Sequence, residues 1–105
     1  YCADLAKVII NIIKKDIFQK FNNKTQIYHY SNTGFVSWHG FTKKIFELAE
    51  INCIINPIKS IDYDRAADIP KNSSLSKDKI TKTLNIKIPE WDESLRYCIH
   101  ALTKC

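Results

Sequence analysis

Residues 28–42, YHYSNTGFVSWHGFT, contain a complete strand, turn and helix start. Aromatic residues are frequent over 27–31, which is typical of a β-strand. Gly34 lets the chain reverse at 32–34, because glycine accepts positive φ without a steric cost. Ser37 is a favourable N-cap for a helix that we expect to run to about Ala49. The pattern predicts a protein in which strands and helices are mixed.

Three further helices are expected around this stretch. Residues 3–18 have the spacing of an amphipathic helix, with an apolar stripe of Leu5, Val8, Ile9, Ile12 and Ile13. Residues 76–84 form a short helix that Ser76 caps and that Asn85 ends in the left-handed conformation. Residues 90–103 form the last helix, with a predicted buried stripe of Trp91, Leu95, Cys98, Ile99 and Leu102.

In total, the sequence predicts four helices and two short strands, and the strands lie at 27–31 and 53–58. Two strands make a poor sheet on their own, so we expect them to add to the edge of a larger sheet. Trp38 and Trp91 lie on the apolar sides of their helices and are expected to anchor the core.

Composition indicates one soluble globular domain at most. The chain has 105 residues, of which 45% are hydrophobic and 26% charged. No apolar run approaches the roughly 20 residues of a membrane span, and no signal peptide is recognisable, so we expect a cytoplasmic protein. The sequence contains no Met. We therefore expect a truncated chain.

The net charge of +5 comes from scattered lysines, which favours solvated faces over a nucleic-acid site.

No metal site is expected. The four cysteines, Cys2, Cys53, Cys98 and Cys105, include no Cys-x-x-Cys pair and are interpreted as reduced thiols. The three histidines are far apart and read as ordinary surface or half-buried residues. Asp62, Asp64 and Asp68 lack the glycine and the terminal glutamate of a calcium loop.

The groups that perform hydride chemistry are also missing from the sequence. A dinucleotide-binding loop needs three close glycines, whereas this chain has only Gly34 and Gly40. No tyrosine is followed by Lys at the fourth position. We therefore expect no catalytic and no cofactor-binding residue here. The loop 63–74 is rich in donors that suit a diphosphate or a nucleotide, and a plain connection is the alternative: its candidate substrate-binding residues are Arg65, Lys71, Asn72 and Ser73.

Four segments, in order along the chain, resemble motifs of the dTDP-4-dehydrorhamnose reductases. They are Tyr1-x-x-Asp4-Leu5-Ala6, then Tyr28-His29 with Gly34 and Ser37-Trp38, then Ser73-x-Leu75-x-Lys77, and finally Pro89-x-Trp91 with Ser94-Leu95. The sequence departs from the family pattern at Ile69-Pro70, where Arg-Pro is usual, and at Glu50, where a helix-ending Gly is usual. A left-handed Glu50 would cost about 1 kcal/mol.

The resemblance implies an α/β fold: the C-terminal, substrate-binding part of an extended short-chain dehydrogenase of Rossmann type, with residues 1–105 as one domain fragment. The N-terminal dinucleotide-binding part, which would hold NADPH and the catalytic residues, is absent. The full-length oxidoreductase would make dTDP-rhamnose for polysaccharide biosynthesis, and this part would help to form the dTDP-sugar cleft. Part of its apolar surface would face the missing part, so self-association is also expected. The alternatives are a non-catalytic, reductase-like binding or regulatory subunit and, less favoured, a small basic helical domain that binds nucleic acid.

Overall fold

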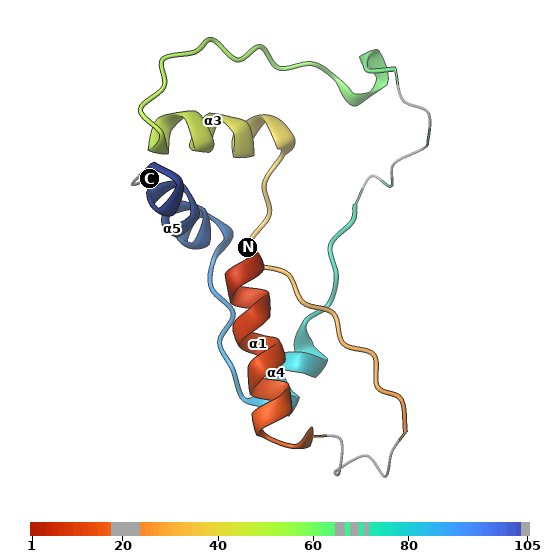
Figure 1. The fold of residues 1–105 in the computed structure, drawn as a ribbon. Coiled ribbons are helices and arrows are strands. Elements are labelled where there is room, and N and C mark those ends of the chain that lie inside the picture. The colour runs from red at the N-terminus through yellow and green to blue at the C-terminus, as the bar shows by residue number, and fades with distance from the viewer. Residues whose placement is uncertain (18–23, 65–66, 68–69, 71, 104–105) are drawn as a thin grey trace.

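The computed structural model describes residues 1–17, 24–64, 67, 70 and 72–103. Its elements, in chain order, are α1 (Cys2–Lys14), α3 (Trp38–Leu48), the short 3₁₀ helix η1 (Ser60–Asp62), α4 (Asp78–Leu84) and α5 (Trp91–Thr103). Figure 1 shows α1 beside α4 at one end of the molecule and α3 beside α5 at the other. The extended segments on either side of α3 and before α5 connect the two ends. No helix in this described part of the chain is long and apolar enough to cross a membrane.

The small core lies between α1 and α4. Val8 of α1 packs with Ile80 and Leu84 of α4 and with Ile17 and Ile88. The half-buried side chains Ile12, Tyr28, Tyr30 and Ile86 surround this cluster. Leu84 is 1% exposed and is the most deeply buried large side chain in the described core.

At the other end, α3 packs against α5 through an aromatic contact. The ring centroids of Phe41 and Trp91 lie 5.8 Å apart. Trp91 is half-buried, in keeping with its predicted place in the core. Trp38 is 79% exposed, so the prediction that it anchors the core is wrong. It is the first residue of α3, where its ring meets Phe41 at 6.4 Å but lies beyond the contact with α5.

The helices confirm the sequence predictions apart from their ends. The first is shorter than the predicted 3–18, since it ends at Lys14 and Asp16 takes a φ of 44°. α4 begins at Asp78 with Lys77 as its N-cap, so Ser76 is not the capping residue; its Oγ accepts a long hydrogen bond of 3.5 Å from Asp78 N–H. Asn85 is left-handed as predicted, with φ 51° and ψ 56°.

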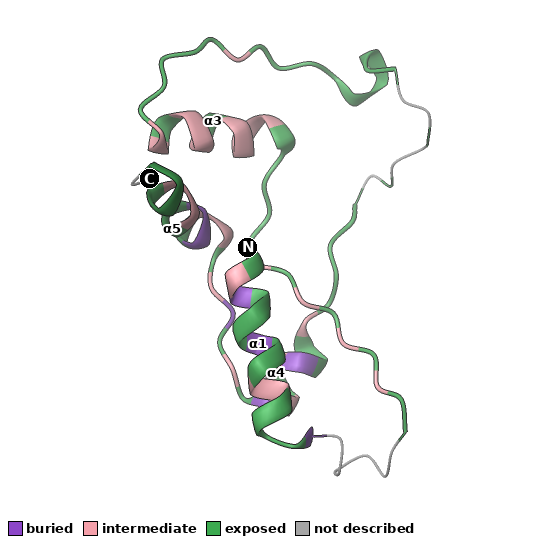
Figure 2. Cartoon of the chain, viewed as in Figure 1, coloured by how far each residue is buried: buried purple, intermediate pink, exposed green. Residues whose placement is uncertain are grey.

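The predicted stripes are only partly buried. In α1, Val8 is buried and Ile12 half-buried, whereas Leu5, Ile9 and Ile13 are 42%, 48% and 62% exposed. In α5, Leu95 is buried, while Leu102 near its end is 69% exposed. Figure 2 shows the exposed part of α1 along most of its length. The described helices therefore carry more apolar surface than they cover for one another.

The predicted strands follow open paths in Figure 1 and have no strand partner among the described residues. Over 26–31 the side chains alternate between half-buried (Gln26, Tyr28, Tyr30) and exposed (Ile27, His29, Ser31). This period of two is the pattern of a strand with one covered face. The prediction that both segments add to a larger sheet stays a prediction.

The molecule is expanded for its length. Its radius of gyration is 17.5 Å, whereas a compact domain of this size has about 13 Å. Its accessible surface is 8993 Å², against about 6,000 Å² for a compact chain of the same mass. The described residues 49–64, which include η1, extend away from α3 in Figure 1.

Candidate functional site

The predicted diphosphate loop is only partly described by the structure. Arg65 and Lys71 lie outside the described residues. Asn72 and Ser73 are exposed. The Asn72 side-chain oxygen accepts a hydrogen bond of 2.9 Å from the backbone N–H of Ser74, a local turn that orders this end of the loop. The role of these four residues in binding substrate stays a prediction.

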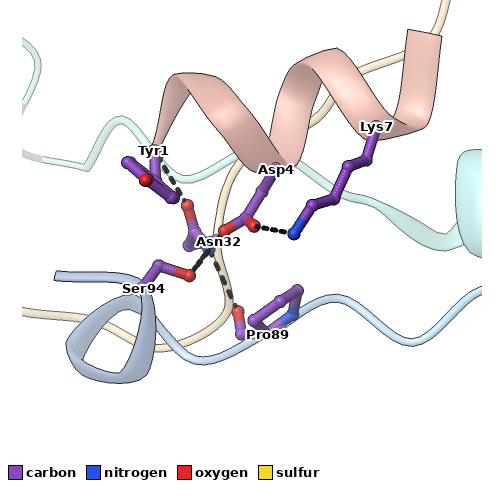
Figure 3. Close-up of polar contacts among 6 residues, drawn as sticks. All are labelled: Tyr1, Asp4, Lys7, Asn32, Pro89 and Ser94. Atoms are coloured by element: carbon purple, nitrogen blue, oxygen red, sulfur yellow. Dashed lines mark hydrogen bonds and ion pairs between the residues drawn. The ribbon is translucent and has the colours of Figure 1, made fainter. Parts of the chain in front are cut away.

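The structure instead brings together three polar side chains from distant parts of the sequence, which we call the polar junction: Asp4, Asn32 and Ser94 (Figure 3). The Ser94 hydroxyl donates to Asp4 Oδ2 at 2.5 Å, and the Asn32 amide donates to the same oxygen at 3.1 Å. The Asn32 amide nitrogen also lies 2.8 Å from Ser94 Oγ and 3.4 Å from the carbonyl of Pro89. Asp4 is 9% and Ser94 2% exposed, so the bonds are shielded from water.

The environment of Asp4 keeps it ionised. Burial raises the pKa of the Asp4 carboxyl. The hydrogen bonds from Ser94 and Asn32 and the charge of Lys7, 3.9 Å away, together lower the pKa by more than burial raises it, so the net pKa lies below its ordinary value. Burial, followed by the negative charge of Asp4, raises the pKa of Tyr30. A carboxylate with a lowered pKa and a phenol with a raised pKa are poor proton-transfer groups near neutral pH. The junction therefore has the chemistry of a structural site.

Backbone contacts extend the junction to a short parallel bridge between Thr33 and Glu90. Thr33 N–H donates to the Pro89 carbonyl and Trp91 N–H donates to the Thr33 carbonyl, both at 2.9 Å. Gly34 has a φ of 95°, and a Cβ at this position would lie 2.7 Å from Trp91 Cδ1. The predicted Gly turn is confirmed, and the close approach of Trp91 is a second reason for glycine.

Two lysines connect the third motif segment and the start of α4 to the region of the polar junction. Lys77 Nζ donates to the Asn32 carbonyl at 3.1 Å. Lys79 Nζ donates to the Ile27 carbonyl at 3.0 Å and lies 4.9 Å from the centre of the Tyr28 ring. Residues from all four segments that carry the family resemblance thus meet around the junction.

The described residues offer no metal-binding group of three or more His, Cys, Asp or Glu side chains. The three described cysteines, Cys2, Cys53 and Cys98, are free thiols, and Cys98 is half-buried. His39 is half-buried as expected and lies 3.4 Å from the Ile55 carbonyl.

Comparison with known proteins agrees with this convergence of motifs. The family model described as RmlD substrate binding domain matches residues 1–104. The chain belongs to this family. No solved structure matches it.

The relatives of this RmlD-type substrate-binding domain are longer proteins. A dTDP-4-dehydrorhamnose reductase of Aggregatibacter actinomycetemcomitans is 33% identical over 102 residues, which cover 91% of this chain and 34% of the relative. That of Sinorhizobium fredii is 29% identical over 103 residues, covering 94% and 35%. The spore coat polysaccharide biosynthesis protein SpsK of Bacillus subtilis is 30% identical over 96 residues, covering 91% and 31%. The chain therefore spans about a third of the length of the curated relatives that it matches.

Sequence reasoning identified Asp4 and Ser94 only as parts of motifs and Asn32 only as a turn residue. The available signal was the position of polar residues on helix sides that are otherwise apolar. Asp4 lies one turn before Val8, and Ser94 immediately precedes Leu95, and all four residues are buried. A buried polar side chain requires a hydrogen-bond partner, but the sequence does not say which one.

Proposed function

We propose that this chain is the C-terminal substrate domain of an NADPH-dependent dTDP-4-dehydrorhamnose reductase that acts in dTDP-rhamnose biosynthesis. In this proposal a separate dinucleotide-binding part holds NADPH and carries the catalytic residues. The present domain closes one side of the dTDP-sugar cleft and orients the substrate, which lowers the entropic part of the barrier. The names of the relatives and the family match support the assignment.

The observation that carries the proposal is the meeting of the four motif segments around Asp4, Asn32 and Ser94. These residues join α1, the 32–34 turn and α5, and the described residues 49–64 extend away from α3 (Figure 1). His39 contacts the Ile55 carbonyl on one side of the predicted loop, and Lys77 donates to the Asn32 carbonyl on the other. Long loops anchored on rigid elements are frequent sites of ligand contact. In the proposal Arg65, Lys71, Asn72 and Ser73 contact the diphosphate.

The direct test is a chimaera in which residues 1–104 replace the matched region of the A. actinomycetemcomitans reductase. With NADPH and dTDP-4-dehydrorhamnose, the chimaera is expected to oxidise NADPH, whereas the 105-residue chain alone is not. Oxidation of NADPH by the 105-residue chain alone would contradict the proposal that a separate part holds NADPH and the catalytic residues. A folded chimaera without any turnover would count against the assigned activity.

The loop residues are tested in the same chimaera. Arg65→Ala and Lys71→Ala each remove charged donors, so KM for the sugar nucleotide is expected to rise roughly tenfold with kcat nearly unchanged. Lys82→Ala, on the exposed side of α4, is the matched control and is expected to leave KM unchanged. Equal KM values in all three variants would exclude the loop as the diphosphate site.

A second candidate function is a non-catalytic, reductase-like binding subunit. It is favoured by Ile69-Pro70, where the family usually has Arg-Pro. Arg can bind a diphosphate through two hydrogen bonds, which an isoleucine cannot provide. Ile69→Arg in the chimaera separates the candidates. A fall in KM on this substitution supports a substrate domain in which this contact has been weakened, and tight dTDP-sugar binding without turnover in either form supports the binding subunit.

A further inference from the structure

Lys77 lies between the candidate substrate loop and α4, and the structure fixes it on both sides. Its carbonyl accepts hydrogen bonds from the Thr81 N–H at 3.0 Å and from the Thr81 hydroxyl at 3.1 Å, which attach it to α4. Its Nζ donates to the Asn32 carbonyl at 3.1 Å, 45 positions away in the sequence. Lys77 therefore connects the start of α4 to the polar junction.

The Lys77 side chain is half-buried, which is uncommon for a group that solvent normally surrounds. Holding its long stem in one place costs side-chain entropy. A hydrogen bond from a charged donor is stronger than one from a neutral donor and offsets this cost. The acceptor residue is itself held, since the Asn32 side chain bonds to the buried Asp4 and Ser94. The contact thus joins Lys77 to a well-anchored part of the domain.

The residues before Lys77, 72–76, are all exposed. Their side-chain hydrogen bonds are local: the Asn72 oxygen accepts the Ser74 N–H, and the Ser76 hydroxyl accepts a long bond from the Asp78 N–H. Turns of this kind shape the chain over a few residues but do not attach it to distant parts of a domain. Lys77 supplies such an attachment, because its side chain reaches the 32–34 turn.

We propose that Lys77 is a positioning residue for the dTDP-sugar, an inference that rests on the proposed function. By joining residues 72–76 to the polar junction, it sets where Asn72 and Ser73 meet the diphosphate. Its ammonium stays on the Asn32 carbonyl and does not touch the substrate. Donors that are oriented before the substrate arrives lower the entropic cost of binding, so the effect belongs to KM and not to kcat.

Lys79 provides a matched comparison in the same region. Its Nζ donates to the Ile27 carbonyl at 3.0 Å and lies 4.9 Å from the centre of the Tyr28 ring. Both lysines therefore attach the start of α4 to a carbonyl of the segment 27–32. Lys79 lies inside α4, however, whereas Lys77 directly follows residues 72–76. A purely structural role predicts the same effect on substrate binding for both lysines, and a positioning role predicts an effect for Lys77 alone.

The first experiment uses Lys77→Met and Lys79→Met in the chimaera, since methionine keeps an unbranched apolar side chain and lacks the charged donor. Lys77→Met is expected to raise KM for the sugar nucleotide roughly fivefold, with kcat nearly unchanged. Lys79→Met is expected to leave KM unchanged, although it lowers the urea midpoint at least as much as Lys77→Met. Lys77→Arg, which retains a charged donor, is expected to keep most of the wild-type affinity.

The second experiment is independent of catalysis and uses the 105-residue chain. Nuclear magnetic resonance relaxation measures the backbone order parameters of Ser73 and Ser74, which lie in the turn that Lys77 attaches. Lys77→Met is expected to lower these order parameters to below about 0.6, the range of flexible backbone, and Lys79→Met to leave them at their wild-type values.

Equal rises in KM for the two methionine variants overturn the proposal and leave Lys77 as a stabilising contact only. A higher KM for Lys77→Met with unchanged order parameters also overturns it, because the lysine then contacts the substrate itself. A chimaera without turnover counts against the proposed function, and the order parameters then decide alone. In that case a fall confined to Lys77→Met supports the role of Lys77, and equal values in all variants overturn it.

Discussion

At the scale of single residues, Asp4 is a buried carboxylate that connects distant parts of the chain. Its carboxylate receives the Ser94 hydroxyl and the Asn32 amide, and so joins α1, the 32–34 turn and α5. Buried hydrogen bonds to a charged acceptor are stronger than neutral ones and are costly to break from one side only. The polar junction is therefore both a stabilising contact and a point of weakness.

Asp4→Ala is expected to lower the free energy of unfolding by about 2–3 kcal/mol, because Asn32 and Ser94 lose their buried acceptor. Urea unfolding followed by tryptophan fluorescence measures the change. Glu93→Ala, at an exposed position next to Ser94, is the control and should cost under about 1 kcal/mol. Similar losses in both variants would show that the junction contributes little.

The junction also predicts how stability depends on acid. The pKa of Asp4 in the folded state lies below its ordinary value near 3.8. Its contribution is complete above that value and is lost as the pH falls through the lower folded pKa. The wild-type chain should thus lose more stability below about pH 4 than Asp4→Asn, which cannot ionise. Parallel pH profiles for the two proteins would contradict this assignment.

Glu50 is a strained residue that the sequence comparison had singled out. It follows α3 with a φ of 56°, the left-handed conformation in which the family usually has glycine. Glu50→Gly is expected to raise the free energy of unfolding by about 0.5–1 kcal/mol, since glycine has no Cβ penalty there. Glu47→Gly, inside α3, should instead lower it by about 1 kcal/mol. A loss of stability from both substitutions would rule out strain at Glu50.

At the scale of elements, residues at the ends of α3 set where this helix begins and stops. Ser37 has extended dihedral angles and its hydroxyl accepts the Gly40 N–H at 3.0 Å, as an N-cap does. The start of the helix was predictable because an N-cap is a local feature, whereas the left-handed residue after its end, Glu50, was indicated only by the family pattern. α1 is different, since its sequence shows an apolar helix but not which side of it the domain covers.

Ser37→Ala is expected to destabilise the chain by about 1 kcal/mol, because the Gly40 N–H loses its acceptor. Thermal unfolding followed by circular dichroism at the helix band measures this change. Ser37→Asp should restore most of the stability, since an aspartate also caps and favours the positive end of the helix dipole. If Ser37→Asp is as unstable as Ser37→Ala, the hydroxyl acts in some other way.

At the scale of the whole molecule, the main feature is the large surface that remains exposed after folding. The chain keeps 8993 Å² accessible to solvent, about half as much again as a compact chain of its mass. Leu5, Ile9 and Ile13 of α1 contribute to it, as does Trp38. Such a surface fits a domain that completes its core against another polypeptide.

The urea m-value of the 105-residue chain is therefore expected to be about a quarter smaller than that of a compact protein of equal length, because m scales with the surface exposed on unfolding. Equilibrium unfolding, with a compact single domain of similar length as the reference, provides the measurement. An m-value equal to the reference would mean that the chain in solution buries more surface than the structure shows.

The sequence by itself determined the helices, the Ser37 cap, the left-handed Asn85 and the turn at Gly34. These depend on interactions within a few residues, for which side-chain type and spacing are sufficient. It also indicated the family, since its motifs are linear.

Only the tertiary structure decided which motif residues meet and which apolar faces are covered. Ser94 and Asp4 are 90 positions apart, and their hydrogen bond depends on the path of the whole chain between them. Likewise, Val8 is buried and Ile9 exposed although both are apolar neighbours on one helix. Burial is set by what lies opposite a side chain in space, and local spacing carries no information about that partner.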